Sequence, residues 1–151
     1  MKSLPERKKW MSLLAKAPSE LVSNTFSDVM ERHGLTAEFT WLRKPEIGGV
    51  MIQARAGATG APFNFGEMTV TRCSLKLENG DVGHAYVQGR DKDKAEKAAI
   101  IDAYLQGDKA EIFAANIIAP IENALAAVKA NREQKAAKTK VDFFTLVRGE
   151  D

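Results

Sequence analysis

An Asn79-Gly80 pair between two alternating runs constrains the fold of this chain more than any other local feature. Residues 67–77 precede the pair and residues 82–89 follow it, and in both runs apolar and polar side chains alternate. Asn-Gly suits the tight turn of a β-hairpin, because both residue types tolerate positive φ. Residues 67–89 are therefore predicted to form two adjacent antiparallel strands.

Two earlier runs extend the predicted sheet. Residues 38–44 alternate between large apolar and polar side chains, and residues 49–55 form a second run after Pro45-Glu46. Proline lacks a backbone N–H and interrupts a strand ladder, so Pro45-Glu46 is interpreted as a turn. A glycine-rich loop, residues 57–62, then leads into the hairpin. The sequence thus predicts a four-stranded antiparallel meander.

Helical patterns lie on either side of the meander in the sequence. Residues 5–33 show apolar spacings of 3, 4 and 7, which predict two helices separated at Pro18. Asp91 or Asp93 is expected to open a further helix, because an aspartate side chain can cap the free N–H groups of a first turn. The predicted fold class is α+β: the meander is flanked by N-terminal and C-terminal helices and followed by an extended C-terminal tail.

The last part of the chain combines a helical pattern with an apolar end. Pro120 is expected to split the helix into a short segment, about 108–118, and a long one that ends near residue 138. Residues 141–149 are interpreted as a strand, and either of its faces would expose large apolar side chains to water. This tail is expected to dock on its own body or, in the interpretation adopted here, on another subunit.

The predicted domain organisation follows from that tail. Residues 1–140 are expected to form one α+β domain, and residues 141–151 a partner-docking tail. The side chains assigned to the docking contact are Phe143, Phe144, Leu146, Val147 and Arg148.

Composition excludes several classes of protein. The 151 residues carry 22 basic and 20 acidic side chains, a net charge of +2, so a whole-chain electrostatic grip on nucleic acid is not expected. Cys73 is the only cysteine, and with two histidines it leaves too few ligands for a complete metal site within one chain. No apolar run approaches the ~20 residues of a membrane span. The charged N-terminus lacks a signal-peptide hydrophobic region, so a cytoplasmic location is expected.

Strand phase places several cationic side chains on one face of the predicted sheet. Arg55, Arg72 and Arg90 share this face, beside the loop that contains Gly57 and Gly60. Guanidinium groups and free loop amides both suit phosphate oxygens, so these five residues form a candidate phosphate or anion site. Two other interpretations stay open. The face is the ordinary solvated side of an antiparallel sheet, or its arginines meet acidic groups on a partner.

The remaining titratable residues do not assemble into a catalytic set, and no catalytic residue is assigned. His84 lies on the cationic face, but no nucleophile can be placed beside it, which favours a solvated or hydrogen-bonded histidine. Cys73 lies on the apolar face and is expected to act as a small core residue. Asp102 lies among alanines on its helix. It is expected either to pair with a base where another element approaches closely or to point into water.

Several blocks of the sequence together resemble one family. Their order and spacing are similar to those of the PhnG family, the small subunits of the bacterial carbon–phosphorus lyase core complex. The resemblance covers nearly the whole chain and is weakest over residues 108–140. The matching blocks are Gln53–Gly57, Thr59-Gly60, Gly66–Cys73, Gly89–Asp91, Ala95-Glu96, Ile101–Ala103 and Val141–Gly149.

The resemblance implies a role in the breakdown of organophosphonates. In the PhnG family this subunit works with PhnH, PhnI and the ATPase-like PhnL to displace adenine from ATP with a phosphonate, giving an α-D-ribose 1-phosphonate 5-triphosphate. A further core subunit, PhnJ, cuts the carbon–phosphorus bond. The resemblance therefore implies a subunit of a transferase and lyase complex. ATP and an alkylphosphonate would be substrates of the complex, and this chain alone would bind no cofactor.

The leading hypothesis is an accessory subunit that is inactive alone. It combines the apolar tail, which needs a partner, with the missing catalytic constellation. Two alternatives remain. One is a free-standing binding module for a phosphorylated ligand that uses the arginine face, and the other is a purely structural scaffold subunit.

Overall fold

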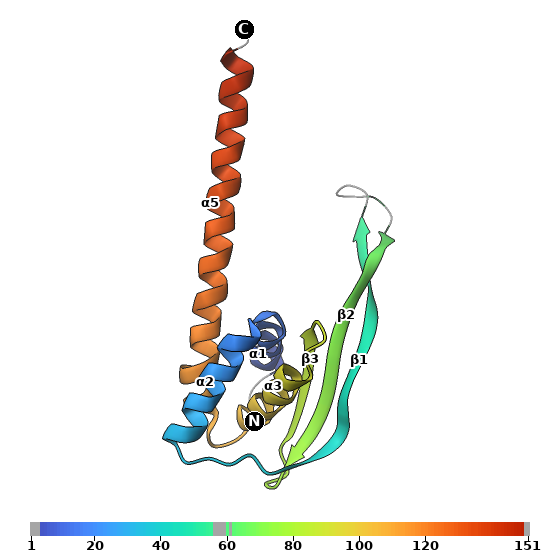
Figure 1. Cartoon of the computed structure of the whole chain (residues 1–151), viewed down its shortest axis with the longest axis vertical. Helices are drawn as coiled ribbons and strands as arrows, with labels where there is room; N and C mark the ends of the chain where they lie inside the picture. The colour runs from blue at the N-terminus through green and yellow to red at the C-terminus, as the bar shows by residue number, and fades with distance from the viewer. Residues whose placement is uncertain (1–3, 56–59, 61, 150–151) are drawn as a thin grey trace. The chain divides into compact units, whose positions relative to one another are not determined.

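The computed structural model of the protein describes residues 4–55, 60 and 62–149; at residues 4–5, 54–55, 62, 64–65 and 139–149 it describes the backbone only. The chain divides into two compact units, residues 1–121 and residues 122–151. The first unit holds all the described strands, and its helices lie on one side of the sheet (Figure 1). The second unit consists of the greater part of one helix.

The sheet contains three described strands, antiparallel and in the order β1-β2-β3. They are β1 (Phe39–Arg55), β2 (Pro62–Leu77) and β3 (Val82–Gln88). The prediction of four strands is wrong, because the two runs on either side of Pro45 belong to the single strand β1. The register with β2 shifts between Arg43 and Glu46, so Pro45 lies at a bulge on an outer strand. No ladder hydrogen bond is required of it there.

The hairpin predicted at Asn79-Gly80 is confirmed, and residues 78–81 connect its two strands. The Leu77 N–H donates to the Asp81 carbonyl at 2.8 Å, and the Gly80 N–H donates to the Leu77 carbonyl at 3.0 Å. Gly80 has a φ of 97°, which a residue with a Cβ rarely adopts. The Asn79 side-chain oxygen accepts from the Asp81 N–H at 2.9 Å and holds the turn together.

The first unit contains the helices α1 (Leu4–Lys16), α2 (Ser19–Arg32) and α3 (Lys92–Tyr104). Helices α1 and α3 pack on the sheet, and α2 packs on α3. The two helices predicted before Gly34 are therefore confirmed. Asp91, and not Asp93, caps α3, because its carboxylate accepts from the Lys94 N–H at 2.9 Å. Asp93 pairs instead with Lys97 one turn further along, at 2.6 Å.

Helix α3 approaches β3 closely because the facing side chains are small. A Cβ at Gly83 would stand 1.9 Å from the Ala99 carbonyl oxygen, so only glycine fits there. Ala95 and Ala98 are also buried on this helix. The alanine-rich face of the sequence is thus a packing face, and it lets backbone approach backbone.

Large apolar side chains from helices and strands fill the core. Phe113 is fully buried and stacks on Tyr104, with ring centroids 4.6 Å apart and an angle of 13° between the planes. Six further large side chains are almost completely buried beside them in the core: Leu14, Leu75, Ile101, Leu105, Ile117 and Ile121.

After a turn over residues 105–109, the chain is continuously helical through α4 (Ala110–Phe113), a π-helical turn η1 (Ala114–Ile118) and α5 (Ala119–Gly149). Pro120 does not separate two helices as predicted. It lies in the first turn of α5, directly after the π turn in which the Ala119 N–H donates to the Ala114 carbonyl. Because proline has no N–H to donate and crowds the preceding turn, the wider π turn accommodates it without a break.

The prediction of an extended C-terminal tail is wrong. Helix α5 continues through residues 141–149, which were expected to form a strand. The preceding residues 131–140 are rich in alanine, lysine, glutamate and glutamine, all strong helix formers. A helix also satisfies its backbone internally, whereas a lone strand cannot.

Candidate functional site

On β2 and β3 the outer face of the sheet is polar and follows the predicted strand phase. On β2, Arg72 and Lys76 are exposed, while the alternating Cys73, Leu75 and Leu77 are buried. The exposed partners on β3 are His84, Tyr86 and Gln88. The assignment of these side chains to two faces is confirmed, with one exception: Val70, expected on the polar face, is almost fully buried.

Two arginines on this face share one carboxylate. Glu46 of β1 is paired with Arg72 of β2, and its Oε2 lies 3.5 Å from the Arg72 Nε and 3.5 Å from an Arg43 amino nitrogen. All three side chains are about half exposed. At this exposure ion pairs contribute little to folding stability, so the cluster leaves its guanidinium donors available to a partner or a ligand.

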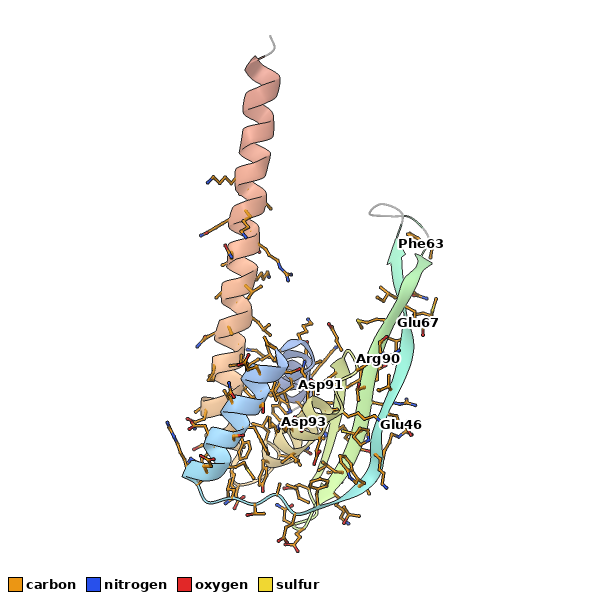
Figure 2. All side chains as sticks on the ribbon, viewed as in Figure 1. Glu46, Phe63, Glu67, Arg90, Asp91 and Asp93 are labelled. Carbon is orange, nitrogen blue, oxygen red and sulfur yellow. The ribbon has the colours of Figure 1, made fainter. Side chains whose placement is uncertain are left out.

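The structure spreads the predicted anion-site residues along the sheet. Arg55 ends β1 opposite Pro62, which lies ten residues from Arg72 along β2. At about 3.3 Å per residue the two positions are roughly 30 Å apart, so one phosphate group cannot contact both. Arg90 is exposed after the end of β3 (Figure 2).

Parts of the same predicted site fall outside what the structure describes. Gly60 is described and half-buried, whereas Gly57 lies outside the described residues, as does the side chain of Arg55. The prediction of a phosphate or anion site over these residues stays a prediction.

Strands β1 and β2 continue beyond β3 as a two-stranded ribbon. Strand β3 pairs with β2 only between Val70 and Lys76, whereas β1 and β2 pair as far as Arg55 and Pro62 (Figure 1). The ribbon exposes large apolar side chains, including Met51 at 57% and Phe63 at 46%. Phe63 lies near the far end of the ribbon (Figure 2). A two-stranded ribbon that is exposed to solvent on both faces is only marginally stable, so we expect another surface to pack against this one.

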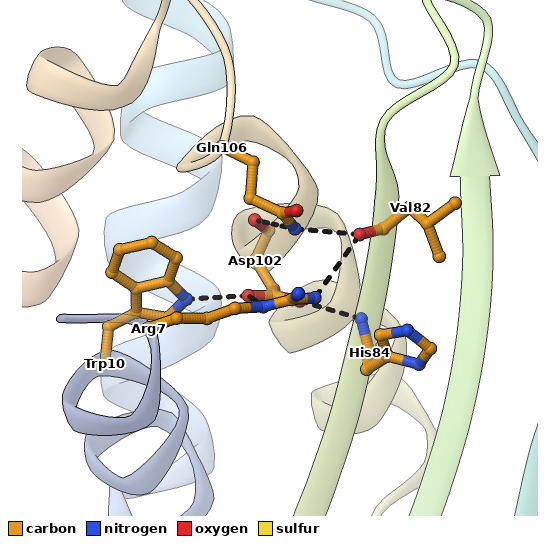
Figure 3. A network of polar contacts seen from close by, with 6 residues as sticks. All are labelled: Arg7, Trp10, Val82, His84, Asp102 and Gln106. Carbon is orange, nitrogen blue, oxygen red and sulfur yellow. Dashed lines mark hydrogen bonds and ion pairs between the residues drawn. The ribbon is translucent and has the colours of Figure 1, made fainter. Parts of the chain in front are cut away.

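A buried carboxylate joins three elements of the first unit. Asp102 of α3 is fully buried and accepts from two Arg7 nitrogens, at 2.7 and 3.2 Å (Figure 3). It also accepts from the Trp10 indole N–H at 2.7 Å and from the His84 backbone N–H at 2.9 Å. Of the two expectations for Asp102, pairing with a base is therefore confirmed.

This network has a structural role, because its donors satisfy the carboxylate completely. The His84 side chain is exposed, and only its backbone N–H takes part. Gln106 extends the network by donating to the Val82 carbonyl at 2.8 Å and to the Asp102 carbonyl at 3.0 Å. Helix α1 is thereby tied to both α3 and β3.

Cys73 is a core residue, as the sequence predicted. Its thiol is buried and donates to the Ala95 carbonyl at 3.3 Å. Burial, together with the charge of Glu96, raises the pKa of the Cys73 thiol to about 12. The thiol is therefore protonated and unreactive at neutral pH. Among the described residues, no group of three or more potential metal ligands is found.

The predicted docking residues all lie in helix α5. Its backbone is helical through Val141–Gly149, and the side chains of Phe143, Phe144, Leu146, Val147 and Arg148 lie outside the described part of the chain. One described helical stretch, Ala110–Lys138, is long and apolar enough to span a membrane by length and composition. A helix of a soluble protein can meet the same two criteria, so this is weak evidence for a membrane span.

Comparison with known proteins identifies the family. A family model described as phosphonate metabolism protein PhnG matches residues 5–149. The chain belongs to the PhnG family. A curated relative from Rhizobium meliloti (strain 1021), the alpha-D-ribose 1-methylphosphonate 5-triphosphate synthase subunit PhnG, is 39% identical over 149 residues. The match covers 97% of this chain and 91% of the relative. The resemblance found in the sequence blocks is confirmed.

Two features of this PhnG-family chain were not found by sequence reasoning. Arg7 and Trp10 were assigned only to a helical pattern, although they are the side-chain partners of Asp102. The pattern placed Arg43 in the run 38–44 but did not assign it to the cationic face, and the turn predicted at Pro45-Glu46 removed Glu46 from the sheet. A bulged strand would have placed both on the Arg72 face.

Proposed function

We propose that the chain is an accessory subunit of the bacterial carbon–phosphorus lyase core complex. With PhnH, PhnI and PhnL it supports transfer of the ribose 5-triphosphate moiety of ATP to an alkylphosphonate, with release of adenine, and PhnJ belongs to the same assembly. The similarity to a subunit of an alpha-D-ribose 1-methylphosphonate 5-triphosphate synthase supports this assignment. The chain is proposed to be inactive alone and to work in the cytoplasm without a cofactor of its own.

The uncovered β1–β2 ribbon is the observation that carries the subunit role. Met51, Ile52 and Phe63 are exposed on it, although large apolar side chains normally find cover in a stable soluble protein. A subunit interface would bury them and supply the free energy of association. The apolar residues of α5 between Phe143 and Val147 are proposed to contribute a second contact with a partner.

The test compares the chain alone with the assembled complex. The chain is co-expressed with PhnH, PhnI and PhnJ, PhnL is added, and adenine release from ATP and methylphosphonate is measured. We expect no release by the chain alone, full activity in the assembly, and strong loss when this chain is omitted. Adenine release by the isolated chain, or full activity without it, contradicts the proposal.

A truncation after Lys140 tests the contact assigned to α5. We expect weaker co-purification with the other subunits, because the apolar residues between Phe143 and Val147 are removed. Undiminished co-purification contradicts that assignment, and the β1–β2 ribbon is then the remaining proposed contact with the other subunits.

The alternative functions make separate predictions. A free-standing binding module would bind ATP or methylphosphonate tightly in calorimetry of the isolated chain. A phosphate site at Arg72 or Arg90 would make Arg72→Ala or Arg90→Ala raise the KM of the complex for ATP. A pure scaffold would leave KM and kcat unchanged in both variants.

A further inference from the structure

The outer sheet face concentrates positive charge in adjacent rows. The strand register places Arg43 beside Ser74 and His84, and the next row holds Glu46, Arg72 and Tyr86. On the other side of the Arg43 row, Lys76 lies opposite Thr40. Among the described side chains of these three rows, Glu46 is the single carboxylate against three permanent cations.

The geometry at Glu46 indicates which chemistry the cations recognise. One Glu46 carboxylate oxygen lies 3.5 Å from a guanidinium nitrogen of Arg43 and 3.5 Å from a guanidinium nitrogen of Arg72. Both contacts are long for charge-assisted hydrogen bonds, which favour about 2.7–2.9 Å. Each guanidinium has five N–H donors, so most of this donor capacity is left over for a further carboxylate.

The surroundings of the arginines favour a protein segment over a small anion. Tyr86, beside Arg72, is 45% exposed, and Leu42, beside Arg43, is 56% exposed. Arginine and tyrosine exposed together on an open surface are typical of protein interfaces, whereas small ligands prefer concave sites that enclose most of their surface. Charge complementarity then requires carboxylate side chains on the partner.

We infer that the face formed by Arg43, Arg72, Lys76 and Tyr86 docks an acidic segment of another subunit. Aspartate or glutamate side chains of that segment bind the two guanidinium groups, and Tyr86 covers apolar atoms of the same segment. Glu46 competes with the incoming carboxylates and moderates the affinity. The inference rests on the proposed function, because that function supplies the partner subunits. The chemistry assigned to the face comes from its own side chains.

The experiment measures the affinity of the chain for the assembly of PhnH, PhnI and PhnJ as a function of salt. Charge reversal in Arg43→Glu/Arg72→Glu is expected to weaken binding at least about tenfold and to reduce the salt dependence. Glu46→Gln removes the competing carboxylate and is expected to strengthen binding several-fold at low salt. Arg32→Glu, at an exposed arginine of α2 that pairs with Asp28, is the matched control and should leave affinity unchanged.

Glu46→Gln separates docking from a structural role. If the Glu46 contacts only hold the sheet together, this variant leaves affinity unchanged or lowers it, and the inference is wrong. Affinity that is insensitive to the double charge reversal also overturns it. Arg43→Gln/Arg72→Gln, with folding checked by circular dichroism, replaces the charge reversal if that variant misfolds.

A competition arm distinguishes an acidic segment from a polyphosphate. Saturating ATP should not displace the chain from the assembly. If ATP displaces the wild-type chain but not Arg43→Gln/Arg72→Gln, the face binds phosphate and not an acidic segment. If the wild-type chain does not bind the other subunits at all, the proposed function itself fails. If it binds and only the charge variants have no effect, this inference alone fails.

Discussion

Replacing Asp102 by alanine should destabilise the first unit strongly. The carboxylate is fully buried and accepts from Arg7, from the Trp10 indole and from the His84 backbone N–H. Asp102→Ala removes every one of these acceptors at once. The variant should therefore cost far more than an ordinary surface substitution.

The magnitude follows from the donors that lose their partner. The Trp10 and His84 N–H groups would be left buried and unsatisfied, at about 1.5 kcal/mol each. The Arg7 guanidinium, about a quarter exposed, loses its counter-ion, which adds about 1–2 kcal/mol. The sum is about 4–5 kcal/mol, or a fall in Tm of roughly 10–15 °C for a chain of this length. Asp102→Asn keeps one acceptor oxygen and should cost about 2 kcal/mol.

Urea unfolding of the full chain, followed by tryptophan fluorescence and circular dichroism, measures the change in the free energy of unfolding. Asp93→Ala on the same helix is the matched control, because Asp93 is exposed and pairs only one turn away with Lys97. It should change stability by less than about 0.5 kcal/mol. A cost below about 1 kcal/mol for Asp102→Ala would refute the reasoning that the network stabilises the fold.

Three further predictions concern other buried or capped groups. Cys73, whose pKa is raised to about 12, should resist thiol reagents at pH 8 until the chain unfolds. The free energy of unfolding should fall as pH rises from 9 to 12, because only the thiol of the unfolded chain ionises in that window. The Ser19 hydroxyl and the Lys94 N–H hold the pKa of Asp91 below its usual value, so stability should fall as pH drops below about 4 through that lowered pKa. An acid titration of Asp91→Asn should lack that loss. Gly83→Ala should lower Tm by several degrees through a clash with the Ala99 carbonyl, and an unchanged Tm would show that α3 can move away.

Local signals in the sequence were sufficient for much of the fold. Asn79-Gly80 located the β2–β3 hairpin, because the turn residue that needs positive φ is glycine. The alternation on β2 assigned Arg72 and Cys73 to opposite faces, as burial confirms. Turn positions and strand alternation depend on residues that are close together in the chain, so a single sequence is enough to predict them.

The errors arose where tertiary context decides the outcome. Pro45 stops a strand by local rules, but a bulge on the outer strand β1 accommodates it. Residues 141–149 have β-forming side chains, but the strong helix formers before them extend α5 through the segment. The partners of Asp102 could not be found from spacing, because Arg7 is 95 residues away in the chain.

The separation of 95 residues between Arg7 and Asp102 also determines when their contact can form during synthesis of the chain. Helix α1 is made first, yet its arginine and its indole obtain their acceptor only when α3 has emerged, after β1, β2 and β3 have been made. Until then the apolar face of α1 has no completed core to bury against, and such exposed surface favours aggregation. Contacts between distant parts of a chain also slow folding. The nascent N-terminal helix therefore exposes apolar surface until translation of α3 is complete.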